Sequence, residues 1–159
     1  MPRKDKNDLQ VLRYLDKLDY AKEWGEYTDN KKVNEILSEA SKNGTDEKGF
    51  PDLIYVNDNK KLLILVENKS SISKHISDEG TYDPVNYAVD GLNWYMDHFL
   101  NIDPKEKRHL NEYFKNWNIL GFAISGDLDD EYNHRISTYA IIKTTTKGKI
   151  KETIQEIDK

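Results

Sequence analysis

Two short runs of branched aliphatic residues, separated by a polar turn, most constrain the fold of this chain. The runs are "DLIYV", residues 52–56, and "KLLILV", residues 61–66, and the turn Asn57-Asp58-Asn59 lies between them. Runs of this length and composition on either side of a polar turn are typical of two antiparallel strands. The second run is apolar on both faces, so we expect it to be an interior strand that is covered on both sides.

The rest of the chain shows periodicities that predict helices and further strands. We expect helices from Leu9 to about Leu18, from a cap at Thr28-Asp29-Asn30 to Asn43-Gly44, and over 84–100 with Pro84 in the first turn. The weaker expectations are a short helix or an insertion in 103–117, strands in 118–127 and 135–143, and a weak helix within 147–159 supported by the isoleucine spacing. Together they predict an α/β fold of the α+β type, with a mixed sheet of about four or five strands flanked by helices.

Length, composition and charge set the broad class. The 159 residues suit a single domain, 1–159, whose core spans about 30–145 and whose first residues, 1–8, are too polar to pack. There are no cysteines, and no apolar run has the length of a membrane span or the form of a secretory signal, so we expect a cytoplasmic protein. The net charge of −5 argues mildly against a freestanding nucleic-acid binder, although a metal site itself needs carboxylates and a further domain can supply DNA affinity.

The second strand ends in charged residues, and this is the feature that points to chemistry. Alternation along a strand places Glu67 and Lys69 on one face and Asn68 on the other. Asp52, at the start of the partner strand, is expected to lie within reach of Glu67. Two carboxylates that converge repel each other unless a cation lies between them, and oxygen ligands suit Mg²⁺. A neighbouring lysine would orient or deprotonate a water molecule, or stabilise charge that develops on a phosphate.

A plain structural explanation also exists, because an acidic residue two positions before a lysine is common in so charged a chain. Four other tripeptides match this pattern, and all four lie in polar or turn-like segments: residues 29–31, 46–48, 58–60 and 103–105. Only Glu67-Asn68-Lys69 follows an apolar strand and has a Pro-Asp pair one hairpin upstream. The hairpin context therefore favours a functional site over a solvated surface.

Pro51-Asp52, followed after fourteen residues by Glu67-Asn68-Lys69, resembles the signature of the PD-(D/E)xK nuclease superfamily. The order of "EILSEASKNGTDEKGFPDLIYV", "LLILVENK", Lys74-His75, "YAVDGLNWY" and "GFAISG" is similar to the N-terminal nuclease domain of type IIG-like restriction–modification polypeptides. Those polypeptides fuse a nuclease to an N6-adenine DNA methyltransferase and are related to the nuclease domains of type I restriction subunits. The resemblance covers roughly residues 30–145 and implies a restriction-endonuclease-like fold.

The resemblance also implies roles for individual residues. Asp52 and Glu67 would be acidic ligands of Mg²⁺, which Mn²⁺ would replace, the main-chain carbonyl of Asn68 would be a third ligand, and Lys69 would be the catalytic lysine. The expected activity is a metal-dependent DNA endonuclease of a restriction–modification system, leaving 5′-phosphate and 3′-hydroxyl ends. No methyltransferase motif follows Lys159, so the resemblance implies an excised domain or a small stand-alone relative. A methyltransferase or specificity module would be the partner beside DNA, and a homodimer would allow double-strand cleavage.

Several further polar residues are weaker candidates for this site. Related nucleases often use a glutamate of the first core helix, and Glu35 and Glu39 are the choices here, with solvated helix charges as the simpler explanation. Lys74 and His75 are candidates for phosphate contacts, with a plain polar loop as the alternative. Asp90 and Asn93 lie on the helix after the catalytic strand and are further candidates.

Two rival functions remain open from the sequence. One is a non-catalytic nuclease-like module for DNA docking or protein interaction, which would not need Asp52, Glu67 and Lys69 together. The other is a repair or junction-resolving nuclease of a different class.

Overall fold

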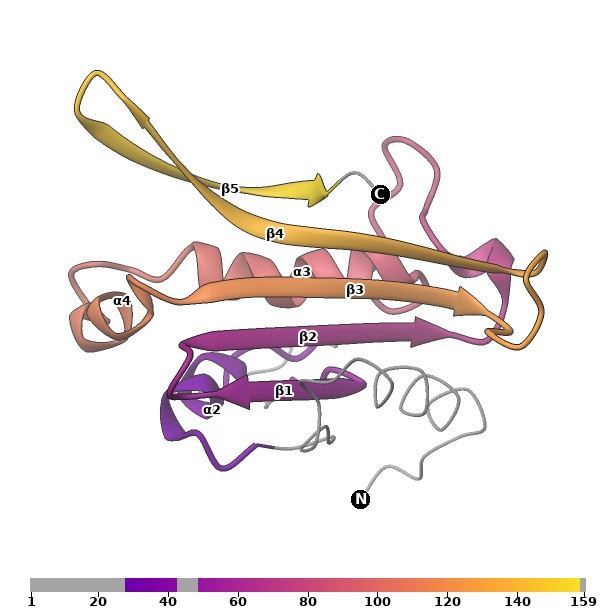
Figure 1. Ribbon diagram of the computed structural model, residues 1–159, viewed down its shortest axis with the longest axis horizontal. Coiled ribbons are helices and arrows are strands. Elements are labelled where there is room, and N and C mark those ends of the chain that lie inside the picture. The colour runs from indigo at the N-terminus through magenta and orange to yellow at the C-terminus, as the bar shows by residue number, and fades with distance from the viewer. Residues whose placement is uncertain (1–27, 43–48, 158–159) are drawn as a thin grey trace.

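A five-stranded mixed sheet forms the centre of the protein in the computed structural model, which describes residues 28–42 and 49–157 (Figure 1). The sheet order is β1-β2-β3-β4-β5, with β2 and β3 parallel and all other neighbours antiparallel. The strands are β1 (Leu53–Asn57), β2 (Leu62–Lys69), β3 (Asn118–Gly126), β4 (His134–Thr146) and β5 (Lys149–Ile157). The predicted α+β class, a mixed sheet of four or five strands flanked by helices, is confirmed.

The predicted hairpin is present as β1 and β2. Leu53 pairs with Val66 and Asn57 with Leu62, so Asn57 belongs to β1 and the turn comprises residues 58–61. β2 lies between β1 and β3 and is buried on both faces. Leu63 and Leu65 belong to one apolar cluster, and Ile64 and Val66 of the same strand belong to the other. The expectation of a doubly covered interior strand is therefore confirmed.

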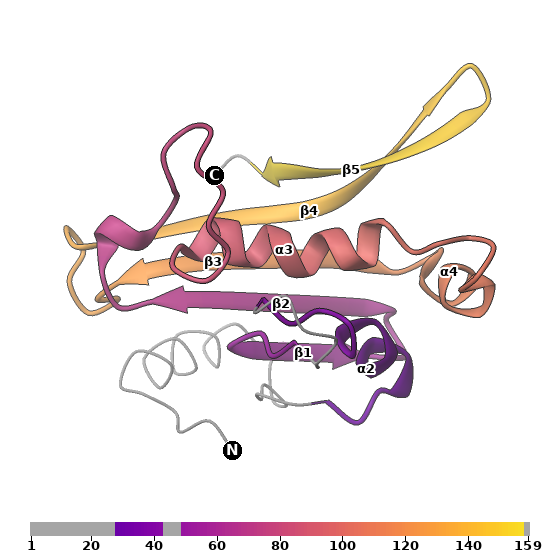
Figure 2. The ribbon, with the colours of Figure 1, turned by 180° about the vertical axis from the view of Figure 1, so that it is seen from behind.

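The crossover between β2 and β3 runs through helix α3 (Ala88–Leu100), which lies across one face of the sheet (Figure 2). Gly121 of β3 lets this helix approach closely, because a Cβ there would lie 2.6 Å from Leu92 Cδ1. The expected start of the helix at Pro84 is wrong. The main-chain N–H of Asp83 instead donates to the Asp90 carboxylate, which holds the preceding segment outside the helix.

Two shorter helices flank the sheet, α2 (Lys31–Leu37) and α4 (Arg108–Phe114), and a 3₁₀ turn, η1 (Ile72–Lys74), follows β2. Asn30 caps α2 as predicted, since its Oδ1 accepts from Val33 N at 2.9 Å. The helix ends at Leu37, however, well before the expected Asn43-Gly44, and Gly49 N donates to the Leu37 carbonyl. The helix expected from Leu9 lies outside the described residues. In the part of the chain that the structure describes, no helix is both long and apolar enough to cross a membrane.

The C-terminal segment is strand β5, so the expectation of a weak helix there is wrong. Lys147 and Gly148 have φ values of 52° and 77°, the pair of positive angles that a tight two-residue hairpin turn requires. β5 then pairs with β4 along its whole length, with Ile154 opposite Ile141. The isoleucine spacing of four and three residues fits a helix face better than a strand, and the tight turn with its long pairing to β4 decides in favour of the strand.

Candidate functional site

The candidate carboxylates lie at the open end of the β1–β2 hairpin, each hydrogen-bonded to the other strand's main chain. The Asp52 main-chain N–H donates to Glu67 Oε1 at 3.3 Å. The Asn68 main-chain N–H donates to Asp52 Oδ2 at 2.7 Å. The hairpin thus brings Asp52, Glu67 and Asn68 into one region at the mouth of the sheet.

Glu67 is almost fully buried and forms an ion pair with a residue that sequence analysis missed. Only 2% of its surface is exposed, and Lys42 Nζ lies 2.6 Å from its Oε2. The same ammonium lies over the Tyr95 ring, 4.7 Å from its centroid. A buried carboxylate needs a cation nearby, and Lys42 supplies it in this structure. No local pattern marks Lys42, which lies 25 positions before its partner.

A glycine of α3 leaves room for this ion pair. A Cβ at Gly91 would lie 2.7 Å from Glu67 Oε2, 2.7 Å from Lys42 Nζ and 2.8 Å from the Pro84 carbonyl oxygen. Glycine inside a helix costs about 0.5–1 kcal/mol relative to alanine. Its presence at position 91 is explained by the close approach of the helix to the buried carboxylate.

Lys69 lies at the end of β2 on the same face as Glu67, because alternate residues of a strand share a face. Its Nζ donates to the Val85 carbonyl oxygen at 2.8 Å. Val85 follows Pro84, whose carbonyl lies near the Glu67–Lys42 pair. Both ammonium groups therefore border the short segment that leads into α3.

Asn68 places its main chain beside Asp52 while its side chain lies on the other face of β2. The N–H and C=O groups of one strand residue project toward the same neighbouring strand. Since the Asn68 N–H donates to Asp52, its carbonyl oxygen lies on the same edge. The main-chain oxygen expected as a metal ligand is thus on the side of the strand that carries Asp52.

A divalent cation at this site would need main-chain and water oxygens beside the two carboxylates. Among the described residues, no three His, Cys, Asp or Glu side chains gather in a way that could hold a metal ion. The donor set of two carboxylates and one carbonyl nonetheless suits Mg²⁺, which keeps several water ligands in protein sites. The Lys42 ammonium at Glu67 shows that a positive charge fits against this carboxylate.

Tyr95 lies close to both carboxylates. Burial raises the pKa of the Tyr95 hydroxyl, the charge of Glu67 raises it further, a hydrogen bond from the Phe50 main chain opposes these effects, and Asp52 adds a smaller increase. The hydroxyl therefore stays protonated at neutral pH.

The two helix glutamates considered from the sequence do not join this group. Glu35 Oε2 lies 2.8 Å from His109 Nε2, and Glu39 Oε2 lies 2.6 Å from Lys107 Nζ. Both partners belong to α4 or the residue before it. Glu35 and Glu39 are therefore engaged with the α4 region, and neither contacts Glu67.

His75 is a structural residue, so its expected role in contacting phosphate is wrong. Its ring is 1% exposed, with Nδ1 2.8 Å from Ser125 Oγ and Nε2 2.7 Å from Ser137 Oγ. These contacts tie the segment after β2 to β3 and β4. Lys74 is exposed, and its Nζ lies over the Tyr87 ring, 4.9 Å from the centroid.

Asp90 and Asn93 of α3 also lie apart from the candidate residues. Asp90 is 4% exposed and accepts hydrogen bonds from Ser77 and from the Asp83 main chain. It stabilises the loop between η1 and α3. Asn93 has a buried Oδ1 without a hydrogen-bond partner among the described residues, and no hydrogen bond joins it to Asp52 or Glu67.

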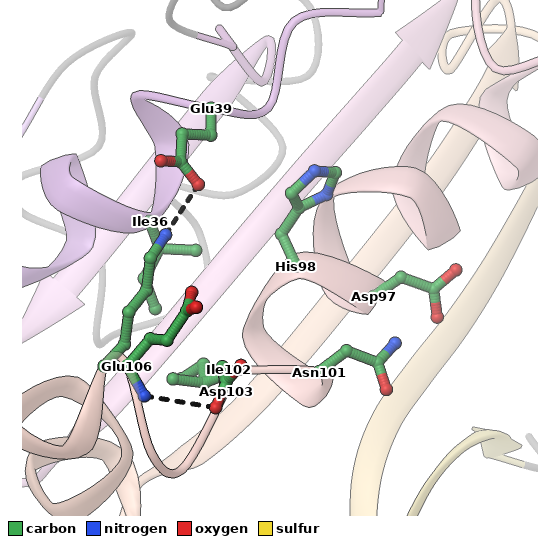
Figure 3. A pocket seen from close by; sticks show the side chains of 9 residues that line it. Ile36, Glu39, Asp97, His98, Asn101, Ile102, Asp103 and Glu106 are labelled. Atoms are coloured by element: carbon green, nitrogen blue, oxygen red, sulfur yellow. Dashed lines mark hydrogen bonds and ion pairs between the residues drawn. The ribbon is translucent and has the colours of Figure 1, made fainter.

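A separate pocket of about 400 Å³ lies between α2, the end of α3 and the segment before α4 (Figure 3). Its charged lining is mainly acidic, with Glu39, Asp97, Asp103 and Glu106 around His98 and Lys107. None of the candidate catalytic residues lines it.

Asp97 lines this pocket, and its carboxyl has a pKa above the ordinary value. Partial burial raises the pKa of the Asp97 carboxyl, and nearby His98 partly opposes the change. The ionised form is thus disfavoured in the folded state, so stability falls as the pH rises through the folded-state pKa. We expect Asp97→Asn to raise the urea midpoint slightly at pH 7, because solvent screens this group, and the gain should vanish below the ordinary aspartate pKa.

The matched variant for this measurement is Asp103→Asn. Main-chain hydrogen bonds from Lys105 and Glu106 lower the pKa of Asp103, so its ionised form is favoured. We expect this variant to lower the urea midpoint at pH 7. A gain of the same sign in both variants would contradict the assignment to Asp97.

Comparisons with protein-family models, curated proteins and solved structures give no match for this chain. The contacts at the mouth of the hairpin are therefore the basis for a proposed function.

Proposed function

We propose that this chain is the metal-dependent DNA endonuclease domain of a restriction–modification system and hydrolyses phosphodiester bonds. The observation that supports it is the reciprocal hydrogen bonding at the hairpin mouth, where Asp52 binds the Asn68 main chain and Glu67 binds the Asp52 main chain. Lys69 emerges beside them from the same strand. The resemblance to PD-(D/E)xK nucleases implies two acidic residues and a lysine at the end of such a hairpin, and these contacts support that reading.

The carboxylates of Asp52 and Glu67 and the carbonyl of Asn68 would hold Mg²⁺ or Mn²⁺. When bound, such an ion polarises a phosphoryl oxygen and lowers the pKa of its water. Lys69 orients the attacking water and stabilises the negative charge that develops on the phosphate. Its ammonium has three donors, so it can keep the bond to the Val85 carbonyl and still present two to the substrate.

Lys42 adds a step that the sequence does not suggest. Its ammonium neutralises Glu67 before any metal binds. A divalent cation would compete with this ion pair, so Lys42 would shift away from Oε2 as the ion enters. The Lys42 side chain is 14% exposed, which leaves a short path toward solvent.

The proposed partners follow from a single hydrolytic centre. One site cuts one strand, so double-strand cleavage requires a second copy of the chain or a second encounter. DNA recognition would come from a methyltransferase or specificity module. We propose a cytoplasmic location, where such systems act on DNA.

A nicking assay with supercoiled plasmid and Mn²⁺ or Mg²⁺ tests the proposal. We expect wild-type protein to nick the plasmid, and Asp52→Ala and Lys69→Ala each to lower the rate by about 100-fold or more. The matched controls are Asp78→Ala and Lys60→Ala, which remove exposed side chains in loops. Nicking that survives both site substitutions would identify a contaminant and overturn the assignment.

One observation favours a non-catalytic module as the second candidate. The Lys42–Glu67 ion pair satisfies the buried carboxylate without a metal, which is what such a module requires. Titration calorimetry with Mn²⁺ separates the two, since a docking module has no need to bind the ion. Linear, nicked and branched duplexes in the cleavage assay would reveal a junction-resolving nuclease by preference for the branched substrate.

A further inference from the structure

The β4–β5 hairpin projects beyond the rest of the sheet, at the end where α4 lies (Figures 1 and 2). Every residue from 143 to 152 is exposed. Strand pairing nevertheless continues to the last pair before the turn, Thr146 with Lys149. We call residues 143–152 the basic ribbon. It is an ordered two-stranded element with no buried side chain of its own.

The basic ribbon concentrates positive charge in a chain whose net charge is −5. Residues 143–151 contain four lysines and no acidic residue. Lys143 lies 3.7 Å from Glu152, whereas Lys147, Lys149 and Lys151 form no ion pair with any described residue. Three unneutralised ammonium groups therefore lie within one short hairpin.

The register places polar and basic side chains together on one face. Lys149 is opposite Thr146 and Lys151 is opposite Thr144, and such pairs share a face. The other face carries the Lys143–Glu152 pair and continues into Ile141 and Ile154, which pack on the α3 side of the sheet. The basic face is consequently the one directed away from α3.

We propose that the basic ribbon binds the phosphate backbone of duplex DNA through Lys147, Lys149 and Lys151. A two-stranded ribbon fits the dimensions of a DNA groove, and lysine contacts phosphate as a point charge. The inference rests on the proposed nuclease function. The ribbon would give a chain of net negative charge a local positive surface for DNA. Charge complementarity selects a polyanion as the occupant, and the hydroxyls beside the lysines suit phosphate oxygens.

The ribbon contacts DNA far from the cleaved phosphate. β4 runs antiparallel to β3, so its end lies opposite the edge where Lys69 pairs with Ser125. At roughly 3.3 Å per residue, Lys143 lies at most roughly 26 Å from this edge and Lys147, at the tip, at most roughly 40 Å. These lengths correspond to about 8 to 12 base pairs of duplex. The ribbon thus anchors the substrate and takes no part in the chemistry.

Fluorescence anisotropy with a labelled duplex of about 24 base pairs, in EDTA and about 50 mM salt, tests this binding. We expect Lys147→Gln/Lys149→Gln/Lys151→Gln to weaken affinity about tenfold or more and to reduce the salt slope by about 2.7. The matched control is Lys31→Gln/Lys60→Gln/Lys115→Gln, which removes the same charge from exposed positions elsewhere. It should change affinity less than about threefold, and circular dichroism checks the fold of both.

The possible outcomes test the ribbon proposal and the nuclease proposal separately. The ribbon proposal would be overturned if both triple variants lost DNA affinity equally. It would also be overturned if the wild-type protein had no measurable affinity for DNA. Asp52-dependent nicking together with unchanged DNA binding by the ribbon variant would overturn the ribbon proposal alone. Ribbon-dependent DNA binding in EDTA without any Asp52-dependent nicking would overturn the nuclease proposal alone.

Discussion

Lys42→Met is expected to lower the free energy of unfolding by about 3–5 kcal/mol in EDTA. The substitution keeps an unbranched side chain one atom shorter than lysine but leaves Glu67, 2% exposed, without its positive partner. Breaking a buried ion pair on one side costs more than the pair itself contributes, because an uncompensated charge remains buried. Urea unfolding followed by circular dichroism measures the loss.

The same variant reports on the proposed metal site. If the carboxylates hold a divalent cation, Mn²⁺ replaces the missing ammonium and restores part of the lost stability, by RT ln(1 + [Mn²⁺]/Kd). The affinity for Mn²⁺ should also rise, because Lys42 no longer competes. The control is Lys107→Met, which removes an equally short ion pair with exposed Glu39 and should cost about 1 kcal/mol or less. A Lys42→Met deficit that Mn²⁺ leaves unchanged would argue against metal binding at Glu67.

Gly91→Ala is expected to disrupt the candidate site through packing alone. Alanine normally stabilises a helix relative to glycine. At position 91, however, its methyl group would lie 2.7 Å from both Glu67 Oε2 and Lys42 Nζ. The third neighbour, the Pro84 carbonyl, is main chain and cannot turn aside. We expect a loss of about 1–3 kcal/mol in stability, and a lower affinity for Mn²⁺ in titration calorimetry because the carboxylate must move.

Gly121→Ala separates overpacking from an effect on the site. Its methyl group would press on Leu92 and Met96 of the same helix, at 2.6 and 2.7 Å, and not on Glu67 or Lys42. We expect a similar loss of stability with Mn²⁺ affinity unchanged. If both variants lost affinity equally, the effect of Gly91 would belong to the general packing of α3.

The parts of the fold that the sequence predicts are those with local signals. The β1–β2 hairpin follows from two aliphatic runs around a polar turn, and alternation along β2 then places Glu67 and Lys69 on one face. The sequence of β5 predicts a weak helix because Ile150, Ile154 and Ile157 recur at spacings of four and three residues, which are helical. The positive φ values of Lys147 and Gly148 fix the turn, and a Lys-Gly pair is a weaker turn signal than Asn-Gly.

The parts that the sequence does not predict depend on contacts between distant residues. Lys42 reaches Glu67 across 25 positions, and no spacing rule distinguishes it from the other lysines. Pro84 is compatible with the first turn of a helix, yet the Asp90 carboxylate binds the Asp83 main chain and delays the helix to Ala88. Such a side-chain to main-chain bond leaves no signature in the spacing of apolar residues.

The buried imidazole of His75 has a consequence for variation elsewhere in the chain. Its ring joins hydroxyls of β3 and β4, and its carbonyl accepts from the Val89 main chain at the start of α3. Through these bonds His75 sets where α3 begins relative to the sheet. It thereby also positions the preceding segment, whose Val85 carbonyl accepts from Lys69 Nζ. Substitutions at Ser137, or at Ser125, which pairs with Lys69 in the sheet, are therefore expected to misalign the lysine.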